Sequence, residues 1–477
     1  GEVTNLIKES KWPTAGPQGH QVANSCRFNS GSSDYLSGPN TNAGSTKTKF
    51  TFSAWIKRSF IGNADNLIIG KWGSGNERGH INFSDTPDDS LIMFEKTSGS
   101  NTTHLVTNRL FRDVSAWYHI VYIGDTTQGT AANRLKLYVN GVQETSFSTA
   151  TYPAEDSNFQ LQAVAKNFGI GSFAADNAGA SSFDGYMSEV VYLDGIVGSV
   201  TDFGEFNSQT GIWVPKVVTG LTFGNNGFYL PFTNSGALGE DFSGEDNDFT
   251  VNNLTSIDQS TDTCSTNFAT MNPLVNNNVN TDMVFREGNL YVELGGSGSC
   301  PVPSTIGLTQ GKWYAELKKV SGSGGNQIFG VTGFANRTTA SNFLGNNSVA
   351  DYGYQDDGEK FIKGSQSGYG ASYADGDIIG IALDLDTAQN TVTFYKNGAS
   401  QGSIDIDGVS TCPDGAYFFA GSDNNIYAQR IFSANFGSPP FAISSGNTDG
   451  NGFGNFEYAV PTGFLSLNTK NLAAVLA

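Results

Sequence analysis

The sequence has few charged residues and especially few cations. Of its 477 residues, 15% are charged, against about 25% in typical soluble domains. Asp and Glu outnumber Lys and Arg by 45 to 26, which gives a net charge of −19 at pH 7. A nucleic-acid groove needs clustered cations to displace phosphate counterions, and the sequence has no such cluster. We therefore expect neither nucleic acid nor an anionic membrane surface as a partner.

Cysteine, histidine and long apolar runs are also scarce. The four cysteines are Cys26, Cys264, Cys300 and Cys412. They form no CxxC pair, and the four histidines all lie in the first third of the chain, which argues against a zinc site. The sequence leaves open one disulfide among the last three cysteines, but favours reduced thiols. No apolar run is long enough to insert into a membrane, and the N-terminus lacks the pattern of a signal peptide.

The sequence is instead rich in glycine (59 residues) and in runs of Ser, Thr and Asn, which are polar without being charged. From Gln21 to about Phe232, strand-like segments alternate with Gly, Asn, Ser and Asp turns, and a second series runs from Asn289 to Gly437. Neither series contains helix-period stretches; only Val200–Asn207 allows a short helical turn. This pattern predicts an all-β protein with two antiparallel β-sandwich or jelly-roll domains in tandem.

Two Asn-Gly dipeptides indicate hairpins within these series. Val121–Phe147 and Ile381–Ile404 both read as strand, turn, strand, Asn-Gly turn, strand. A type I′ turn needs φ > 0 at both central positions, which Asn and Gly tolerate. The Trp-Tyr strands that precede the two dipeptides lie at different distances from them, so we interpret the segments as parts of two different sandwiches.

Composition along the chain suggests five parts. We predict an N-terminal arm (1–20), a first sandwich (21–232), a connector rich in Asp, Asn, Ser and Gly (233–266), a second sandwich (267–437) and a loop-rich tail (438–477).

Four motifs in the first sandwich resemble the laminin-G-like, concanavalin-like jelly rolls. They are FSAWI (Phe52–Ile56), WYHIV (Trp117–Val121), LKLYVNGV (Leu135–Val142) and FDGYMSEVV (Phe183–Val191). Together with CRFNSGSSDYLS before them and FGEFNSQTGIWVP after them, they also resemble large jelly-roll virion proteins of tailed, particularly marine, bacteriophages.

The second sandwich resembles the SPRY family. The motifs, in order, are GKWYAEL (Gly311–Leu317), DGDIIGIALDLD (Asp375–Asp386), VTFYKNG (Val392–Gly398) and ANFG (Ala434–Gly437). The order of the two domains again resembles phage virion proteins. It implies a non-enzymatic structural protein on the virion surface, as capsid decoration or fibre-like adhesin, assembled as homo-oligomers or arrays with other virion proteins and contacting a host glycan.

Two alternatives remain. The first is a secreted bacterial adhesin or Ca²⁺-dependent carbohydrate-binding protein. The second, less favoured, is a polysaccharide-degrading enzyme, because laminarinase-type relatives carry a Glu-x-Asp-x-x-Glu run that is missing here. Glu189 and Asp194 are five residues apart and would face opposite sides of a strand. Gly295–Cys300 lacks a full nucleophile-elbow motif, and we expect His119, inside a strand, to be a packing residue rather than a base.

Candidate binding residues lie where aromatic or acidic side chains adjoin polar loops. For a glycan or protein partner, these are Trp72, Tyr152, Tyr352, Tyr354 and Asp356. An aromatic face can stack on a sugar ring, although such residues also serve as anchors that pack on their own sandwich.

No cofactor is required by the sequence, but calcium is a candidate ligand. The resemblance implies Ca²⁺ in the rim loops of such jelly rolls, with Asp and Asn oxygens as suitable ligands for a hard cation. The candidate residues are Asp125, Asp176 and Asn177. The alternative is that these side chains cap turns.

Overall fold

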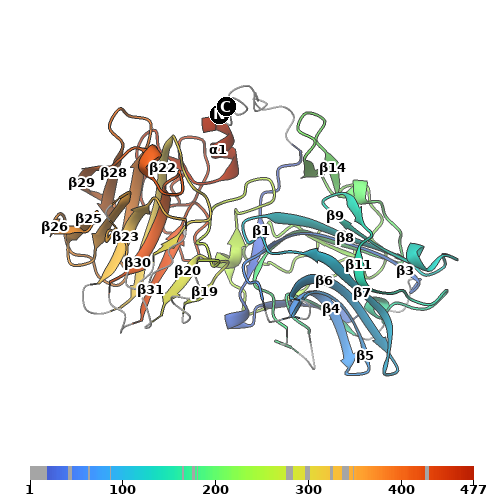
Figure 1. The fold of residues 1–477 in the computed structure, drawn as a ribbon. Coiled ribbons are helices and arrows are strands. Elements are labelled where there is room, and N and C mark those ends of the chain that lie inside the picture. Colours follow the sequence, from blue (N-terminus) through green and yellow to red (C-terminus); the bar gives the residue numbers. More distant parts are fainter. Residues whose placement is uncertain are drawn as a thin grey trace. The chain divides into compact units, whose positions relative to one another are not determined.

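The computed structural model describes residues 19–40, 46–62, 65–85, 88–163, 166–174, 178–179, 181–275, 283–295, 301–322, 326–335, 343–347, 349–424 and 429–476. Contacts divide the chain into two compact units, the first ending at Thr266 and the second beginning at Asn267. We call them the N-terminal and C-terminal sandwich. Both consist of antiparallel sheets, which confirms the predicted all-β fold class (Figure 1). No helix of the described residues is long and apolar enough to cross a membrane.

The N-terminal sandwich contains two eight-stranded sheets. The first runs in the order β10 (Val142–Glu144), β9 (Leu135–Val139), β8 (Trp117–Asp125), β3 (Lys49–Arg58), β13 (Gly185–Asp194), β1 (Ser25–Phe28) and β18 (Gln259–Ser260), with β16 (Phe228–Leu230) paired to β13. The second runs in the order β11 (Phe147–Thr151), β7 (Ser100–Leu110), β6 (Asp88–Thr97), β5 (Glu77–Asp85), β4 (Asn66–Ser74), β12 (Asn167–Ile170), β2 (Tyr35–Asn40) and β17 (Thr250–Asn252). A separate hairpin joins β14 (Gly204–Phe206) to β15 (Trp213–Pro215).

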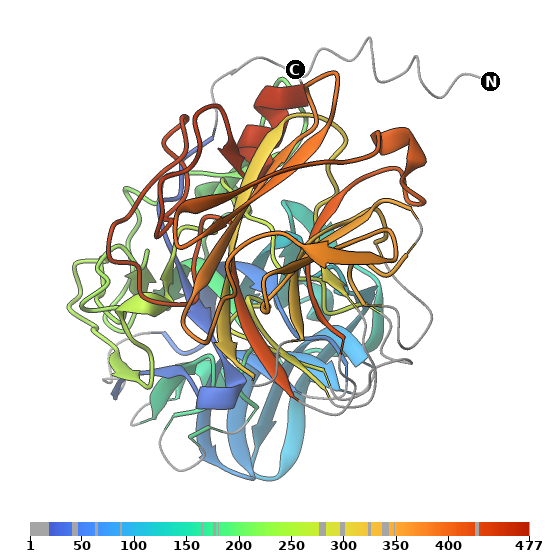
Figure 2. The same cartoon turned by 90° about the vertical axis from the view of Figure 1, so that its left-hand side faces the viewer.

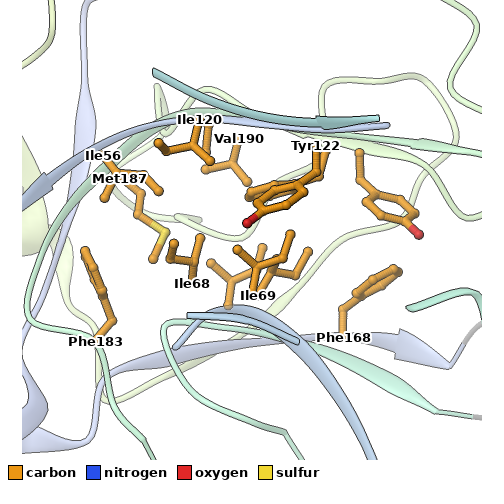
Figure 3. Packing of buried hydrophobic residues seen from close by; sticks show 14 of the residues in the cluster. Ile56, Ile68, Ile69, Ile120, Tyr122, Phe168, Phe183, Met187 and Val190 are labelled. Atoms are coloured by element: carbon orange, nitrogen blue, oxygen red, sulfur yellow. The ribbon is translucent and has the colours of Figure 1, made fainter. Parts of the chain in front are cut away.

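The core of this unit lies between the two sheets. Successive side chains of a strand face opposite sides, so alternate residues point inward, except at an irregularity such as the register shift between Leu67 and Ile69 of β4, where consecutive residues both reach the core. Ile56 and Ile120 of the first sheet face Ile68 and Ile69 of the second, and all four are fully buried (Figure 3). Burying such side chains contributes about 1.5–3 kcal/mol each.

Residues 233–266 differ from the predicted connector because they belong to the N-terminal sandwich. They supply β17 and β18, and their Leu238, Phe249 and Leu254 are buried in its core. These apolar residues are too widely spaced to give a strand pattern, which explains why composition indicated a linker.

The same segment neutralises two buried cations of the first sheet. Asp262 Oδ2 lies 2.7 Å from Lys57 Nζ, and both side chains are 1% exposed. Asp258 Oδ1 lies 3.3 Å from Nη2 of the fully buried Arg27. An unpaired buried charge is strongly unfavourable, so these acidic residues are part of the fold.

Both predicted Asn-Gly hairpins form. Asn140 and Gly141 have φ of 48° and 78°, and Asn397 and Gly398 have φ of 46° and 79°. Val139 pairs with Val142 across the first turn, and the second turn joins β28 to β29. The positive φ values at both central positions are those that a type I′ turn requires.

The C-terminal sandwich also contains two sheets. One runs in the order β19 (Val284–Arg286), β20 (Tyr291–Leu294), β31 (Arg430–Asn435), β22 (Lys312–Ser321), β27 (Ile378–Asp384), β28 (Thr391–Lys396) and β29 (Ala399–Asp405), with β32 (Leu465–Ser466) added parallel to β22. The other runs in the order β21 (Val302–Pro303), β30 (Phe418–Asp423), β23 (Gln327–Thr332), β24 (Asp351–Gln355), β25 (Glu359–Ile362) and β26 (Ser365–Gly368).

The tail after residue 437 is more ordered than a loop-rich tail. It contains β32 and the helix α1 (Thr469–Leu476), which lies beside the end of β22 (Figures 1 and 2). Gln310 Nε2 donates to Val475 O at 2.9 Å, and Leu472 packs against the core. In the N-terminal sandwich, the expected helical turn is a 3₁₀ helix at Val200–Asp202.

Candidate functional site

One face of the second sheet of the N-terminal sandwich carries a pocket of about 370 Å³. On β5, Ile81 and Phe83 point into the core, whereas the alternate residues Arg78, His80 and Asn82 line this pocket. The strand period of two therefore places core and pocket on opposite faces. We call this site the outer-face pocket. Its volume is within the range typical of ligand sites.

Strand register arranges a row of rings along the pocket. His80 pairs with Phe94 of β6, and Phe94 pairs with His104 of β7. The ring centroids of His80 and Phe94 are 5.2 Å apart, and those of Phe94 and His104 are 5.3 Å apart. Residues directly opposite one another in an antiparallel pair are close enough for such contacts.

Two further rings extend the row across β4. Gly70 lies opposite His80, and a Cβ at this glycine would lie 2.7 Å from Phe173 Cε1. The Phe173 ring therefore occupies space that a side chain at position 70 would fill. Its centroid lies 5.5 Å from that of His80 and 5.1 Å from that of Trp72. We call the five rings the aromatic platform: Trp72, His80, Phe94, His104 and Phe173.

Arg78 lies over the platform. Its guanidinium carbon is 5.2 Å from the ring centroids of both Trp72 and Phe94, within the distance at which a cation is attracted to an aromatic face. Its Nη1 also donates to Gly75 O at 2.7 Å, in the β4–β5 turn. The guanidinium is thus held in place by contacts from two neighbouring strands.

The two imidazoles of the platform are neutral at pH 7. Burial lowers the pKa of His80 to about 3, and the nearby Arg78 and His104 add to the shift. Burial also lowers the pKa of His104. Neutral imidazoles offer one donor and one acceptor nitrogen each, so these rings present hydrogen-bonding edges without charge.

Polar groups around the rings have unused hydrogen-bonding capacity. Asn82 Nδ2 donates to Asp65 Oδ1 at 2.9 Å. Within the described residues, the buried Asn82 Oδ1 and His80 Nδ1 have no hydrogen-bond partner. Unsatisfied buried polar atoms are rare because they cost free energy, and these two have almost no surface that solvent can reach.

Of the residues predicted from sequence, Trp72 lies in this pocket. The other residues that line it were not predicted, among them Arg78, His80, Phe94, His104 and Phe173. A signal was present in the alternation of β5, where Arg78, His80 and Asn82 share a face. Which residues of β4, β6 and β7 stand beside them depends on register, which the sequence does not show.

The predicted aromatic residues outside the pocket pack on their own sandwiches. Tyr152 is half-buried against the N-terminal core. Tyr352 and Tyr354 lie on strand β24 rather than in a loop, and are 1% and 0% exposed. The Tyr352 hydroxyl accepts from Asp407 N at 2.9 Å, and the Tyr354 hydroxyl donates to Ala371 O. The two buried rings have no free face on which a ligand could stack.

Asp356 is also buried and paired. Its Oδ2 lies 2.5 Å from Lys319 Nζ. Burial raises the pKa of Asp356, while the hydrogen bond and charge of Lys319 act in the opposite direction. The residue therefore neutralises an internal lysine rather than extending into solvent toward a partner.

Asp125, a candidate calcium ligand, accepts hydrogen bonds within its own turn through both carboxylate oxygens. Its Oδ1 accepts from Thr127 N and Oγ, and its Oδ2 accepts from Gln128 Nε2. Both oxygens thus cap the turn after β8. Asp176 and Asn177 lie outside the described residues. In the part of the chain that the structure describes, no group of three or more His, Cys, Asp or Glu side chains could hold a metal ion.

A buried serine–histidine pair is present but is not a nucleophile and base. Ser53 Oγ lies 2.9 Å from His119 Nε2, and Trp213 Nε1 donates to His119 Nδ1 at 2.9 Å. Because Nδ1 accepts, Nε2 carries the ring proton and donates to Ser53. A base that activates a serine needs the opposite arrangement. His119 is fully buried, as expected of a packing residue.

Cys26, Cys264 and Cys412 are free thiols. Cys300 lies outside the described residues.

Two antiparallel sheets that pack face to face around one core make the N-terminal unit a jelly-roll-like β-sandwich. The chain carries a domain of the concanavalin A-like lectin/glucanases superfamily, matched over residues 30–196, and a SPRY domain, matched over residues 312–426. No curated protein matches the chain.

Solved structures show weak likeness. The SPRY domain of human HERC1 is 16% identical, with a TM-score of 0.27, over 33% of this chain and 95% of that one. A Bacteroides ovatus protein, provisionally described as carbohydrate binding, is 17% identical, with a TM-score of 0.29, over 49% and 59%. The enzymatically active domain of bacteriophage CBA120 tailspike protein 2 is 16% identical, with a TM-score of 0.28, over 37% and 26%. Likenesses at this level carry no argument about function.

Proposed function

We propose that the outer-face pocket binds a glycan and that the protein is a non-enzymatic module displaying this site. The observation that carries the proposal is the aromatic platform, with Arg78, Asn82 and Asp65 around it. A sugar ring has apolar C–H faces that stack on aromatic rings and hydroxyls that need polar partners. The pocket combines an apolar lining with a few convergent polar groups, as small-molecule sites do.

The distribution of carboxylates supports binding rather than hydrolysis. A glycosidase needs two carboxyl groups about 5–9.5 Å apart, on either side of the scissile bond. Of the described residues that line the pocket, Asp65 alone carries a carboxylate, and it already accepts a hydrogen bond from Asn82. Elsewhere in this sandwich, Glu189 accepts from the Tyr229 hydroxyl and Asp194 from Asn226.

We place the module on the surface of a tailed-phage virion, beside other virion proteins. The support is the serial resemblance of the motifs and the order of the two domains. A single pocket of this size would bind a sugar weakly, and repetition in homo-oligomers or arrays would add avidity. Antibody labelling of intact particles under the electron microscope tests this location, which unlabelled particles would exclude.

The binding proposal predicts the effect of Trp72→Ala. Removing this ring takes away a stacking face and one side of the Arg78 contact. Aromatic contacts of this kind are worth about 1–2 kcal/mol, so affinity for a glycan ligand should fall roughly 5- to 30-fold. A glycan array on the purified protein identifies the ligand, and calorimetry compares the variants.

Phe242→Ala is the matched control, since Phe242 is 47% exposed and does not line the pocket. It should bind like the parent protein. We expect EDTA to leave binding unchanged, because the pocket lining includes a single carboxylate. An array with no bound glycan, with or without calcium, excludes the proposal; release of reducing ends from a polysaccharide would exclude the non-enzymatic part.

A further inference from the structure

Arg78 differs from the buried cations of the same sandwich because it has no acidic partner. Its hydrogen bond to Gly75 O and its ring contacts are its interactions within the described residues, and it forms no ion pair there. The remaining N–H groups of the guanidinium are unused. The side chain is partly exposed and lines the outer-face pocket, so a ligand can reach it.

The contrast with nearby cations is clear. Lys57 Nζ lies 2.7 Å from an Asp262 oxygen, and Arg58 Nη1 lies 3.0 Å from Asp89 Oδ1. The fold thus provides carboxylates for cations that serve stability. It holds Arg78 by ring contacts and a backbone carbonyl, which fix its position without neutralising its charge.

A second, smaller pocket of about 140 Å³ shares Arg78 with the first. We call it the rim pocket. Its lining includes Lys71, Lys166 and Glu77. A Cβ at Gly73 would lie 3.1 Å from Lys166 Cε, so the absent side chain leaves room for the lysine beside the strand that carries Trp72.

Charged groups of both signs line the two pockets. Arg78 and Lys166 are cations that lie beside the carboxylates of Asp65 and Glu77, whereas burial lowers the pKa of Lys71 to about 7 and its Nζ lies over the Phe168 ring. Glu77 is already engaged, since its oxygens accept from Ser98 N and Gln160 Nε2. The imidazoles of His80 and His104 add no charge at pH 7. Among the described residues that line the outer-face pocket, Arg78 is therefore the cation and Asp65 is the carboxylate.

We propose that the sugar unit in the outer-face pocket carries an anionic group, a carboxylate or a sulfate, and that Arg78 selects it. This rests on the proposed glycan function. A guanidinium is a planar fork that matches two oxygens of such a group, whereas a lysine is a point charge. The guanidinium carbon of Arg78 lies 5.2 Å from the ring centroids of Trp72 and Phe94, so its unused N–H groups would bind the oxyanion of a sugar that contacts the platform.

Matched polymers test the charge preference. The probes are alginate and its carboxyl-reduced form, and a sulfated galactan and its desulfated form, titrated into the full-length protein. We expect one acidic polymer to bind at least tenfold more tightly than its neutral form, with affinity falling as salt rises. A preference for alginate would identify the anionic group as a carboxylate, and a preference for the sulfated galactan would identify it as a sulfate.

Variants then assign the preference to Arg78. Arg78→Gln should lose the tenfold preference, so that it binds the acidic and the neutral polymer with equal affinity, and Arg78→Lys should retain only part of the preference. Lys216→Gln removes one positive charge from the exposed surface of the same sandwich, outside both pockets, and should retain the full preference. Equal thermal midpoints show that the variants are folded.

The outcomes separate the two proposals. Binding that depends on Trp72 but is equal for acidic and neutral polymers overturns the charge inference and leaves the glycan function standing. If Arg78→Gln weakens binding of the acidic and the neutral polymer by the same factor, the charge inference is also overturned, because Arg78 would then only hold the rings of the platform in place. If no polymer or array glycan binds, both proposals fail.

Discussion

His119 is a buried residue whose surroundings hold it in one neutral tautomer. It stacks on Trp55, with ring centroids 4.6 Å apart, and its two nitrogens bond Ser53 and Trp213. Burial lowers the pKa of His119 from 6.5 to about 3. The unfolded chain therefore binds a proton below pH 6.5 that the folded protein does not bind. The contribution of His119 to stability is complete above pH 6.5 and is lost as the pH falls from 6.5 toward 3.

This predicts how His119→Phe responds to pH. At pH 7 the variant should be less stable, because the Ser53 hydroxyl and the Trp213 N–H lose their partner, at about 1–3 kcal/mol each. Between pH 7 and pH 5 the difference should shrink by about 2 kcal/mol, since the variant has no proton to bind at this position. Urea unfolding of both proteins between pH 5 and pH 7 measures this difference in the free energy of unfolding. A difference that is constant with pH would contradict the assigned pKa.

At the scale of an element, the β14–β15 hairpin is attached to the first sheet through Trp213. The indole occupies a slot between two glycines: a Cβ at Gly141 would lie 2.3 Å from Trp213 Cε3, and one at Gly204 would lie 2.5 Å from Cε2. Gly141 is thus required twice, for the type I′ turn and for the indole. The adjacent Asn140 adds a hydrogen bond from His119 N to its Oδ1, at 2.7 Å.

Gly141→Ala should therefore destabilise the protein by about 2–4 kcal/mol, the sum of a left-handed backbone strain and an overpacked contact. Gly211→Ala is the control, since Gly211 has a φ of 69° but nothing within 4 Å of a Cβ. It should cost about 1 kcal/mol. Chemical denaturation followed by tryptophan fluorescence compares the two. Equal costs would show that the Trp213 contact is relieved by a small shift.

At the scale of the whole molecule, the N-terminal sandwich extends to Thr266 rather than to the last strong strand pattern near Phe232. A fragment of residues 15–266 should unfold cooperatively by itself, because it keeps its core and all its buried ion pairs. A fragment of residues 15–232 loses the partners of Lys57 and Arg27, and each unpaired buried cation costs about 3–5 kcal/mol. Circular dichroism with urea titration compares them; equal stability would show that residues 233–266 are dispensable.

The sequence by itself determined the local features. Alternating strands and turn residues predicted two antiparallel sandwiches, and Asn-Gly predicted two hairpins. The position of Trp72 at a strand end made it a candidate binding residue, and Trp72 lines the outer-face pocket. These depend on neighbours in the chain, because strand periodicity and turn dihedrals are local properties. The same reasoning placed Tyr352 and Tyr354 beside a loop, because it does not show how far a strand continues or what covers it.

Tertiary structure alone decided which side chains meet. Arg78, His80, Phe94 and His104 become one site only when β5, β6 and β7 pair in the observed register, and a one-residue slip would send each strand's side chains to the other face. By composition Asp258 and Asp262 belong to a linker, whereas the fold places them beside Arg27 and Lys57, whose charges they neutralise. Contacts between residues distant in sequence are set by the packing of the whole sandwich, and no local pattern encodes them.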